Sequence, residues 1–404
     1  MKILDSHEFI ELYRGSKDLM LGFLLCEKYN DEYVFLCPKI NSYADEKFFG
    51  QKRFDMKRVE NALGHIPGNM RFRFYSCIRL YKKIIYFKKV ESTNFFHIPA
   101  GYLFKLWRVK PDVIIESNYT TLTPRSYLNY IASKLFRIPV MWIDCGDGGR
   151  MMIFKALEKP VAKNAAKVIT YSQGGKKRLI DKYNIPSERI VVCPKPIDIN
   201  KYRFSLMEET RRKSFCIGYI GRLAENKGFG TFIKLAGHYL NKRMLKFISV
   251  GDFTSEAERT RYMPLIPDNM LLTGYVENKN IPEYMEMIDL LVIPNMTNPP
   301  AFTTVLAEAL ASGIPCIVGI KGYEEYVPVC RQNGCFFVRP DSMEETVDRI
   351  EDLLGKTAEE YNVLKKQARS YAEKELSWEA QLPFYRSLLN EIANKRPQAL
   401  KYRN

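Results

Sequence analysis

Two strings in the second half of the sequence combine residue types that suit a phosphorylated ligand. The first, IGYIGRLAENKGF at residues 217–229, indicates a strand, a glycine turn and the start of a helix. Gly221 lets the chain turn without steric cost, and Arg222 and Lys227 flank that turn. Two fixed cations beside a helix N-terminus suit a diphosphate, because they add charge to exposed amide donors. The alternative is that both are solvated surface cations.

The second string, NPPAFTTVLAEALASGIPCIVG at residues 298–319, predicts a helix beginning near Phe302 and then a buried strand. Thr303 and Thr304 lie near the start of that helix, where free amides can hold phosphate oxygens. Glu308 follows in the first turns, and a carboxylate there can accept two hydrogen bonds from a diol such as ribose. The alternative is an acid favoured only by the helix dipole.

The elements that must position these residues follow an alternating order. Short apolar runs alternate with helix-length segments along the whole chain, which indicates βα units and parallel sheets. A proline-rich and polar stretch at residues 194–204 separates two such halves and is expected to be a linker. Ligands bind at the carboxyl ends of strands in sheets of this kind. The strands are expected at residues 2–4, 33–37, 95–98, 113–116, 140–143, 167–171, 190–193, 215–220, 245–250, 270–273, 290–293, 316–318 and 335–338.

Composition excludes several classes of protein. With 404 residues, 46% of them hydrophobic, the chain is expected to fold into two or three globular domains. Its apolar runs are shorter than the ~20 residues that span a membrane, and its first residues do not resemble a secretory signal. The nine cysteines include no CxxC pair, so we expect no zinc site and buried, reduced thiols. A cytoplasmic protein is the resulting expectation.

The net charge of +16 is unevenly distributed. Residues 1–200 hold 34 Lys and Arg against 20 Asp and Glu, whereas residues 201–404 hold 28 against 26. The excess includes residues 71–90, RFRFYSCIRLYKKIIYFKKV, with seven basic residues and no acidic one.

We expect residues 71–90 to form a helix. Phe74, Ile78, Tyr81 and Ile85 would then share one apolar stripe. Such a helix can lie on an anionic membrane surface. The alternative is a surface helix whose stripe packs into the core. No nucleic-acid-binding motif accompanies the charge, so no nucleic-acid partner is expected.

The order of motifs resembles glycosyltransferase family 4, the retaining GT-B enzymes. The motifs are GRL and KG at 221–228, SVGDF at 249–253, TGYV at 273–276, IDLLVIPN at 288–295, the string from Phe302 to Gly319, EEYV at 324–327 and NG at 333–334. The resemblance covers residues 165–350 well and the first half only in outline. It implies an α/β GT-B fold, with two Rossmann-like doubly wound domains facing a central cleft.

The resemblance also implies a division of labour along the chain. Residues 1–196 are expected to bind the acceptor and residues 197–385 the nucleotide-sugar. A C-terminal helix or tail at residues 386–404 is expected to pack back on the first domain.

The resemblance assigns roles residue by residue. Arg222 and Lys227 match the cations that bind the donor diphosphate, and Glu308 matches the second acid of the E-x7-E element, which binds the ribose. Further donor-binding positions are Gly221, Val276 near the base, the segment Ala301, Phe302, Thr303, Thr304 and Val305, and Gly15 in the N-terminal glycine loop. No metal site and no cofactor beyond the nucleotide-sugar are expected.

Two positions depart from the family pattern. Pro300 stands where the first acid of E-x7-E contacts the donor sugar. The region after the fifth strand, MWIDCGDGGR, carries Asp144 and Asp147 where the family often has a histidine. Asp144 or Asp147 is expected to take an acceptor-binding or base role, with Asp144 as the catalytic candidate. The alternative is an acidic loop that binds backbone amides or Arg150.

The predicted function is a retaining hexosyltransferase that uses a UDP- or GDP-sugar. Its acceptor would be a glycan or lipid-linked saccharide, met at the inner face of the cell membrane during the synthesis of surface polysaccharide or glycolipid. The alternative is a non-catalytic GT-B partner subunit, which Pro300 and the missing histidine favour. A GT-B epimerase or phosphorylase is a third possibility, because fold alone does not decide function.

Overall fold

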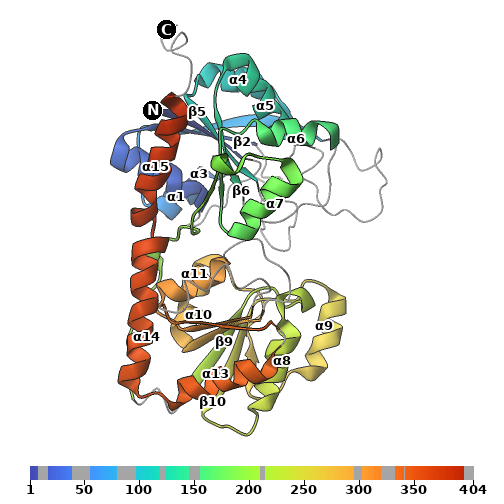
Figure 1. Ribbon diagram of the computed structural model, residues 1–404, viewed down its shortest axis with the longest axis vertical. Coiled ribbons are helices and arrows are strands. Elements are labelled where there is room, and N and C mark those ends of the chain that lie inside the picture. Colours follow the sequence, from blue (N-terminus) through green and yellow to red (C-terminus); the bar gives the residue numbers. More distant parts are fainter. Residues whose placement is uncertain are drawn as a thin grey trace. The chain divides into compact units, whose positions relative to one another are not determined.

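The computed structural model describes residues 1–7, 17–38, 55–79, 97–118, 124–144, 155–209, 214–294, 303–319, 333–340 and 342–394. The chain divides into two compact units. Unit 1 comprises Met1–Cys193 and Gln381–Asn404, and unit 2 comprises Pro194–Ala380. Each unit is built on one sheet with helices packed against it (Figure 1). The expected α/β class with two parallel-sheet domains is therefore confirmed.

The sheet of unit 1 has the strand order β4-β3-β2-β1-β5-β6-β7-β8 in the described residues. All neighbours are parallel except β3 and β4. The strands are β1 (Lys2–Ser6), β2 (Glu32–Pro38), β3 (Met70–Arg79), β4 (His97–Ala100), β5 (Val113–Asn118), β6 (Val140–Asp144), β7 (Lys167–Thr170) and β8 (Ile190–Val192). The helices are α1 (Lys17–Tyr29), α3 (Met56–Leu63), α4 (Tyr102–Val109), α5 (Pro124–Phe136), α6 (Lys155–Lys163), α7 (Gln173–Tyr183) and most of α15 (Trp378–Asn394).

Alternation along the strands separates the two faces of this sheet. Tyr33 and Phe35 of β2 face α1, where a Cβ on Gly22 would lie within 3 Å of either ring. Leu36 points the other way and joins a buried cluster with Tyr102 and Leu106 of α4. Because successive side chains of a strand alternate, the polar side chains at the end of β1 also divide between the two faces.

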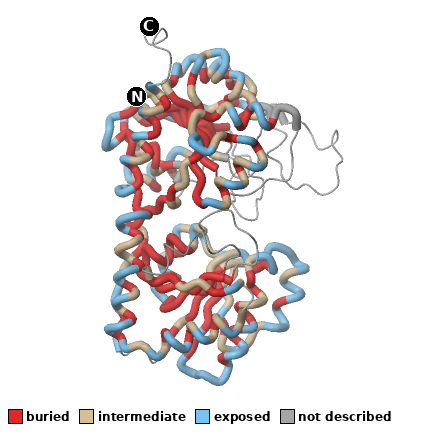
Figure 2. Tube along the Cα trace, in the orientation of Figure 1, coloured by how far each residue is buried: buried red, intermediate tan, exposed pale blue. Residues whose placement is uncertain are grey.

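The sheet of unit 2 is entirely parallel, in the order β11-β10-β9-β12-β13-β14. The strands are β9 (Phe215–Ile220), β10 (Leu245–Val250), β11 (Met270–Leu272), β12 (Leu290–Ile293), β13 (Cys316–Gly319) and β14 (Cys335–Val338). The helices are α8 (Phe229–His238), α9 (Glu256–Tyr262), α10 (Ile281–Met287), α11 (Thr304–Ala311), α13 (Met343–Gly355) and α14 (Ala358–Tyr371). The strands and the inner helix faces are buried (Figure 2).

Each sheet has one point where the order of strands reverses. In unit 1, β2 lies on one side of β1 and β5 lies on the other side. In unit 2 the same reversal separates β9 from β12. Connections leave such a pair of neighbouring strands in opposite directions, so a crevice forms at their carboxyl ends. These two places are where a ligand site is expected from topology alone.

The last helix belongs mainly to unit 1. The guanidinium of Arg386 lies 3.0 Å from Asp31, whose carboxylate also binds the amino terminus at 2.9 Å. Glu391 lies 3.3 Å from Lys167 of β7. The part of α15 in unit 1 begins at Gln381, and the chain enters unit 2 at Pro194, compared with expected boundaries at 386 and 197.

The expected strands are confirmed, and one expected helix is wrong. Every strand range predicted from the alternation overlaps an observed strand. Residues 70–79, however, form strand β3, which pairs with β2 in the sheet. Arg71 and Arg73 are exposed, whereas Phe72 stacks on Phe35 with ring centroids 4.8 Å apart. This period of two fits a half-buried strand. The remainder of the basic segment, residues 80–90, lies outside the described residues.

Candidate functional site

The two strings that carry phosphate chemistry lie at the reversal point of unit 2. Gly221 and Arg222 follow the last residue of β9, and α11 follows β12, the neighbouring strand. Their positions at adjacent carboxyl ends fulfil the geometric requirement that the sequence could only suggest. The glycine turn and the helix that follows β12 are therefore connected to neighbouring strands at the same edge of the sheet.

The glycine turn after β9 is fixed by close backbone contacts. A Cβ on Gly228, which has φ of +72°, would lie 1.5 Å from the carbonyl oxygen of Pro294 at the end of β12. A Cβ on Gly251, with φ of +144°, would lie 1.9 Å from the carbonyl oxygen of Gly221. Only glycine allows both approaches. The turn is therefore held against two neighbouring strand ends.

Tyr219 holds the backbone of the two candidate cations, Arg222 and Lys227. Its hydroxyl donates to the carbonyl of Arg222 at 2.7 Å and to that of Lys227 at 3.5 Å. The ring is buried among phenylalanines, and burial raises the pKa of Tyr219 well above its usual value. The hydroxyl therefore stays protonated and keeps donating at neutral pH. Arg222 itself is exposed and Lys227 is half-buried.

The start of α11 presents several donors at one place. Thr303 precedes the first residue of the helix, and its own side chain makes no capping bond. The Thr303 hydroxyl is buried and finds no hydrogen-bond partner in the described part of the chain. The first amides of the helix lack intrahelical acceptors. Free amides at a helix start are the kind of donor to which anions bind in proteins.

Lys195 places a further cation at the start of α11, and this residue was not predicted from the sequence. Its ammonium group donates to the hydroxyl of Thr304, the first residue of α11. Pro194 and Pro196 flank it, and prolines on both sides restrict its backbone. Ile197 then anchors the segment, because its amide donates to Leu376 at 2.7 Å.

Glu308 lies one turn further into α11 and is buried. Tyr202 donates its hydroxyl to one carboxylate oxygen at 2.9 Å. Burial raises the pKa of Glu308, while the bond from Tyr202 and the charges of Lys201 and Lys195 act in the opposite direction. Lys201 is itself held by the carbonyl and side-chain oxygens of Asn278, at 2.9 and 2.7 Å.

The remaining donor-binding candidates are only partly visible. Val276 is half-buried in the segment after β11, which is tied to the glycine turn because Gly251 donates its amide to the carbonyl of Gly274 at 3.1 Å. Val305 lies in the first turn of α11. Gly15, Ala301, Phe302 and Pro300 lie outside the described residues.

In unit 1, Asp144 ends β6 and is buried. Arg178 of α7 forms an ion pair with its carboxylate, and the Thr170 hydroxyl donates to the same oxygen at 3.3 Å. Asp144 therefore has a close cationic partner, a different one from the Arg150 considered from the sequence. Arg150 and Asp147 lie outside the described residues.

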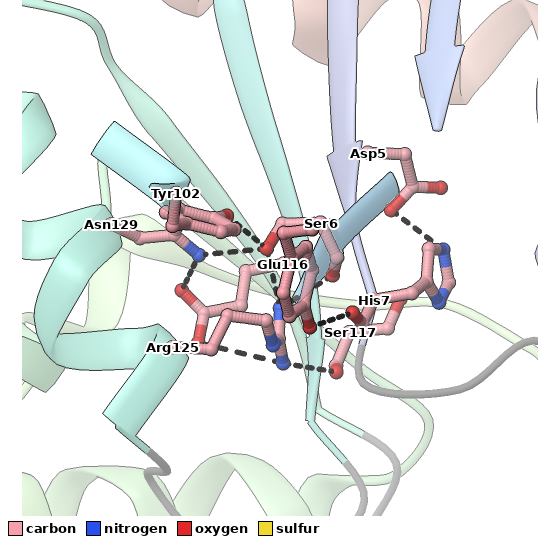
Figure 3. A network of polar contacts seen from close by, with 9 residues as sticks. Asp5, Ser6, His7, Tyr102, Glu116, Ser117, Arg125 and Asn129 are labelled. Carbon is pink, nitrogen blue, oxygen red and sulfur yellow. Dashed lines mark hydrogen bonds and ion pairs between the residues drawn. The ribbon is translucent and has the colours of Figure 1, made fainter. Parts of the chain in front are cut away.

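The reversal point of unit 1 holds a buried polar network that the sequence reading missed (Figure 3). On the α4 and α5 face, the Ser6 hydroxyl lies 2.5 Å from that of Tyr102 and accepts from Arg125 at 2.8 Å. Asn129 donates to Glu116 at 2.9 Å. The charged pair of Arg125 and Glu116 is thus embedded in hydrogen bonds, as buried charges require.

On the opposite face, His7 and Asp5 form a second buried pair (Figure 3). Nε2 of His7 lies 2.8 Å from Oδ1 of Asp5, and Tyr33 donates to the other Asp5 oxygen at 2.6 Å. Tyr75 donates to the His7 carbonyl at 2.8 Å. The only sequence signal for this site was the run of polar residues directly after the first strand.

In the described ranges, no three His, Cys, Asp or Glu side chains gather as a metal ion would require. None of the described helices is both long and apolar enough to cross a bilayer.

Comparison with known protein sequences identifies relatives of unit 2. Residues 214–356 match the family described as Glycosyl transferases group 1. EpsF of Bacillus subtilis, named as a glycosyltransferase, is 26% identical over 184 residues, covering 43% of this chain and 46% of that protein. The mannosylfructose-phosphate synthase of Agrobacterium fabrum is 29% identical over 164 residues, covering 36% and 35%. The chain spans less than half the length of the curated relatives that it matches.

Comparison with solved structures extends over both units. HepE of Anabaena, solved in complex with UDP, has a TM-score of 0.68 at 17% identity and covers 97% of this chain and 100% of that one. A glycosyltransferase from Rickettsia africae has a TM-score of 0.70 at 14% identity, with 97% and 98% covered. Likeness at this identity establishes the fold. The chain therefore has the GT-B fold of these glycosyltransferases, and its residues 214–356 match the family of group 1 glycosyl transferases.

Proposed function

We propose that this protein transfers a sugar from a nucleoside diphosphate donor to a glycan or lipid-linked saccharide. The proposal rests on one observation, namely that the glycine turn after β9 and the start of α11 both lie at the reversal point of unit 2. The turn with Arg222 and Lys227 and the start of α11 offer positive charge and amide donors to a diphosphate. Glu308, one turn further on, offers a carboxylate to the ribose diol.

Uridine is the first candidate for the base of the donor. HepE, with which the chain shares its fold, was solved with UDP, and this supports a UDP-sugar. A GDP-sugar is the second candidate. The segment around Val276 is proposed to contact the base.

The proposed reaction retains the configuration at the anomeric carbon. The bond from the acceptor oxygen to the anomeric carbon forms as the bond to the donor phosphate breaks. The proton of the acceptor hydroxyl passes to the leaving phosphate. Arg222, Lys227 and Lys195 stabilise the charge that grows on the diphosphate, so the proposal needs no metal ion or further cofactor.

Unit 1 is proposed to bind the acceptor at a membrane surface. Its excess of basic residues supports an anionic surface as the place where the acceptor is met. Asp144 receives no proton-transfer role in this proposal, because its ion pair with Arg178 supports the structural alternative.

The proposal is tested by sugar transfer from UDP- and GDP-sugars to glycan and lipid-linked acceptors. We expect the wild type to turn over and Arg222→Ala/Lys227→Ala to lose transfer. Arg243→Ala/Lys246→Ala is the matched control, because both residues are exposed at the amino-terminal edge of the same sheet. Transfer by the Arg222→Ala/Lys227→Ala variant at the wild-type rate would contradict the assigned site.

Pro300 favours one competing function, a GT-B protein that binds nucleotide-sugar without turnover. The same assay separates the two functions. Donor binding without transfer to any acceptor class would support the binding protein, whereas transfer excludes it.

A further inference from the structure

Helices α4 and α5 expose an unusual set of large apolar side chains. The two helices lie side by side on one face of the unit 1 sheet (Figure 1). The exposed fractions are 53% for Phe104, 50% for Trp107, 39% for Ile131 and 66% for Leu135. We name these four residues the α4–α5 face. Monomeric proteins seldom gather such side chains on the surface unless they contact something.

The four side chains of the α4–α5 face are not part of the buried core of unit 1. The opposite sides of both helices already fill the core, with Tyr102 and Leu106 from α4 and Ala132 from α5 buried in one cluster. The helices are therefore anchored from within. Their outward apolar side chains remain available to a partner.

The aromatic part of the α4–α5 face is held in a defined arrangement. The rings of Phe104 and Trp107 stack with centroids 5.9 Å apart and planes inclined by 27°. The guanidinium of Arg108 lies 4.5 Å from the centroid of the Phe104 ring. This cation–π contact holds the charge of Arg108 close to the Phe104 ring. Aromatic and cationic groups at one level match the interface of a bilayer, where both are favoured.

The charged residues of α4 and α5 are all basic. Neither α4 nor α5 contains an aspartate or glutamate. Apart from the buried Arg125, the basic residues on the two helices and directly after them are Lys105, Arg108, Lys110, Lys134 and Arg137. Two copies of such a face would repel each other, which disfavours a dimer formed through it. An anionic surface is the complementary partner.

We propose that the α4–α5 face docks on an anionic phospholipid surface, with Phe104 and Trp107 inserted among the headgroups. This surface differs from the helix expected at residues 71–90, of which the first part is strand β3. The inference deepens the membrane-facing part of the proposed function. It rests on the geometry of unit 1 alone, so it is tested without any nucleotide or acceptor.

The chain carries its own reporter for this contact. It has three tryptophans, and Trp142 and Trp378 are only 5% and 2% exposed. Trp107 is therefore the residue whose fluorescence responds to a new environment. We expect a shift of the emission to shorter wavelength with vesicles of phosphatidylglycerol and phosphatidylcholine. Vesicles of phosphatidylcholine alone should leave the spectrum unchanged, and Trp107→Phe should abolish the shift.

Cosedimentation with the same vesicles tests the face directly. We expect Phe104→Ser/Leu135→Ser and, separately, Arg108→Gln/Lys134→Gln to bind at least tenfold more weakly than the wild type. Leu240→Ser/Met244→Ser removes an apolar pair from unit 2 that is also exposed, at 48% and 41%, and Lys176→Gln/Lys177→Gln removes two cations from α7. Both controls should bind like the wild type.

Three results would overturn the proposal. They are absent binding of the wild type to anionic vesicles, equal binding to both vesicle types, and unchanged binding of both α4–α5 variants. The charge variant keeps the apolar side chains, so it decides the question if the serine variant fails to fold by circular dichroism. A variant that has lost donor binding, such as Arg222→Ala/Lys227→Ala, should still bind vesicles. Failure of this inference can therefore be distinguished from failure of the donor site.

Discussion

Glu308 is buried, yet it must be ionised to accept two hydrogen bonds from a diol. Burial raises its pKa, and Tyr202, Lys201 and Lys195 limit that rise. A carboxyl whose pKa is raised on folding is favoured in its protonated form. Its contribution to stability is therefore complete below the pKa of the unfolded chain and is lost as pH rises through the pKa of the folded protein.

Glu308→Gln removes this titration. Relative to the wild type, we expect the free energy of unfolding of the variant to increase as pH rises above about 4.3, the usual pKa of a glutamate in an unfolded chain. The gain is about 1.4 kcal/mol for each pH unit between the folded and unfolded pKa of Glu308. Urea unfolding at a series of pH values measures it. A difference between variant and wild type that stays constant, or shrinks, with rising pH would refute this view of Glu308.

Lys195→Met tests the cation that the linker segment supplies. The methionine keeps the apolar stem and loses the charge near Thr304. We expect binding of UDP to weaken by about 10-fold, the effect of one charge-assisted hydrogen bond, and binding of uridine to stay the same. Titration of both ligands measures the difference. An equal loss for both would place Lys195 away from the phosphates.

The sequence predicted the site residues that belong to a local motif, and it did not predict those whose partners are distant in the chain. Arg222, Lys227 and Glu308 each sit in a local string whose turn and helix start are visible in the residue types. Lys195 and Tyr202 act on partners 109 and 106 residues away, so only the fold brings them together. The buried pair of His7 and Asp5 gave no motif, because its partners come from three strands.

Among the elements, the turn between β9 and α8 has a backbone that requires glycine at one position. Gly228 has φ of +72° and lies against the carbonyl of Pro294. This close approach joins the turn to the end of β12, on the other side of the reversal point. The position of Arg222 and Lys227 relative to α11 therefore depends on a residue without a side chain.

Gly228→Ala should disturb both stability and the site. The unfavourable φ alone costs about 1–3 kcal/mol, and the overlap with Pro294 forces the turn to move. Gly237→Ala is the matched control, because this helical glycine has open space around its Cβ position and gains about 0.5–1 kcal/mol in helix propensity. Thermal unfolding measures both effects. Equal stability of the two variants would show that the turn tolerates a side chain.

The one misread element shows where patterns of residues fail. Arg71, Phe72, Arg73 and Phe74 alternate with a period of two, but spacings of three and four also occur among the apolar residues downstream. A short run fits both templates, and the pairing of β3 with β2 decides between them. The other strands were predictable because each is an apolar run bounded by turn residues.

For the whole molecule, the two sheets place their polar groups at equivalent topological points. The reversal point of unit 2 holds the candidate donor site, and that of unit 1 holds the network around Ser6, Arg125 and Glu116. The sequence predicted two doubly wound sheets. It could not predict which strands lie at the reversal points, because strand order depends on long-range pairing. This order determines which loops can share a ligand.

The most direct test of the account is calorimetric titration with UDP, GDP and their sugar conjugates. Three proteins are compared: the wild type, Arg222→Ala/Lys227→Ala and the control Arg243→Ala/Lys246→Ala. The expected result is that one nucleotide binds the wild type and the control equally well and binds Arg222→Ala/Lys227→Ala at least about 100-fold more weakly, since two charged contacts are lost. Unchanged binding by that variant, or no binding of any nucleotide to the wild type, would contradict it.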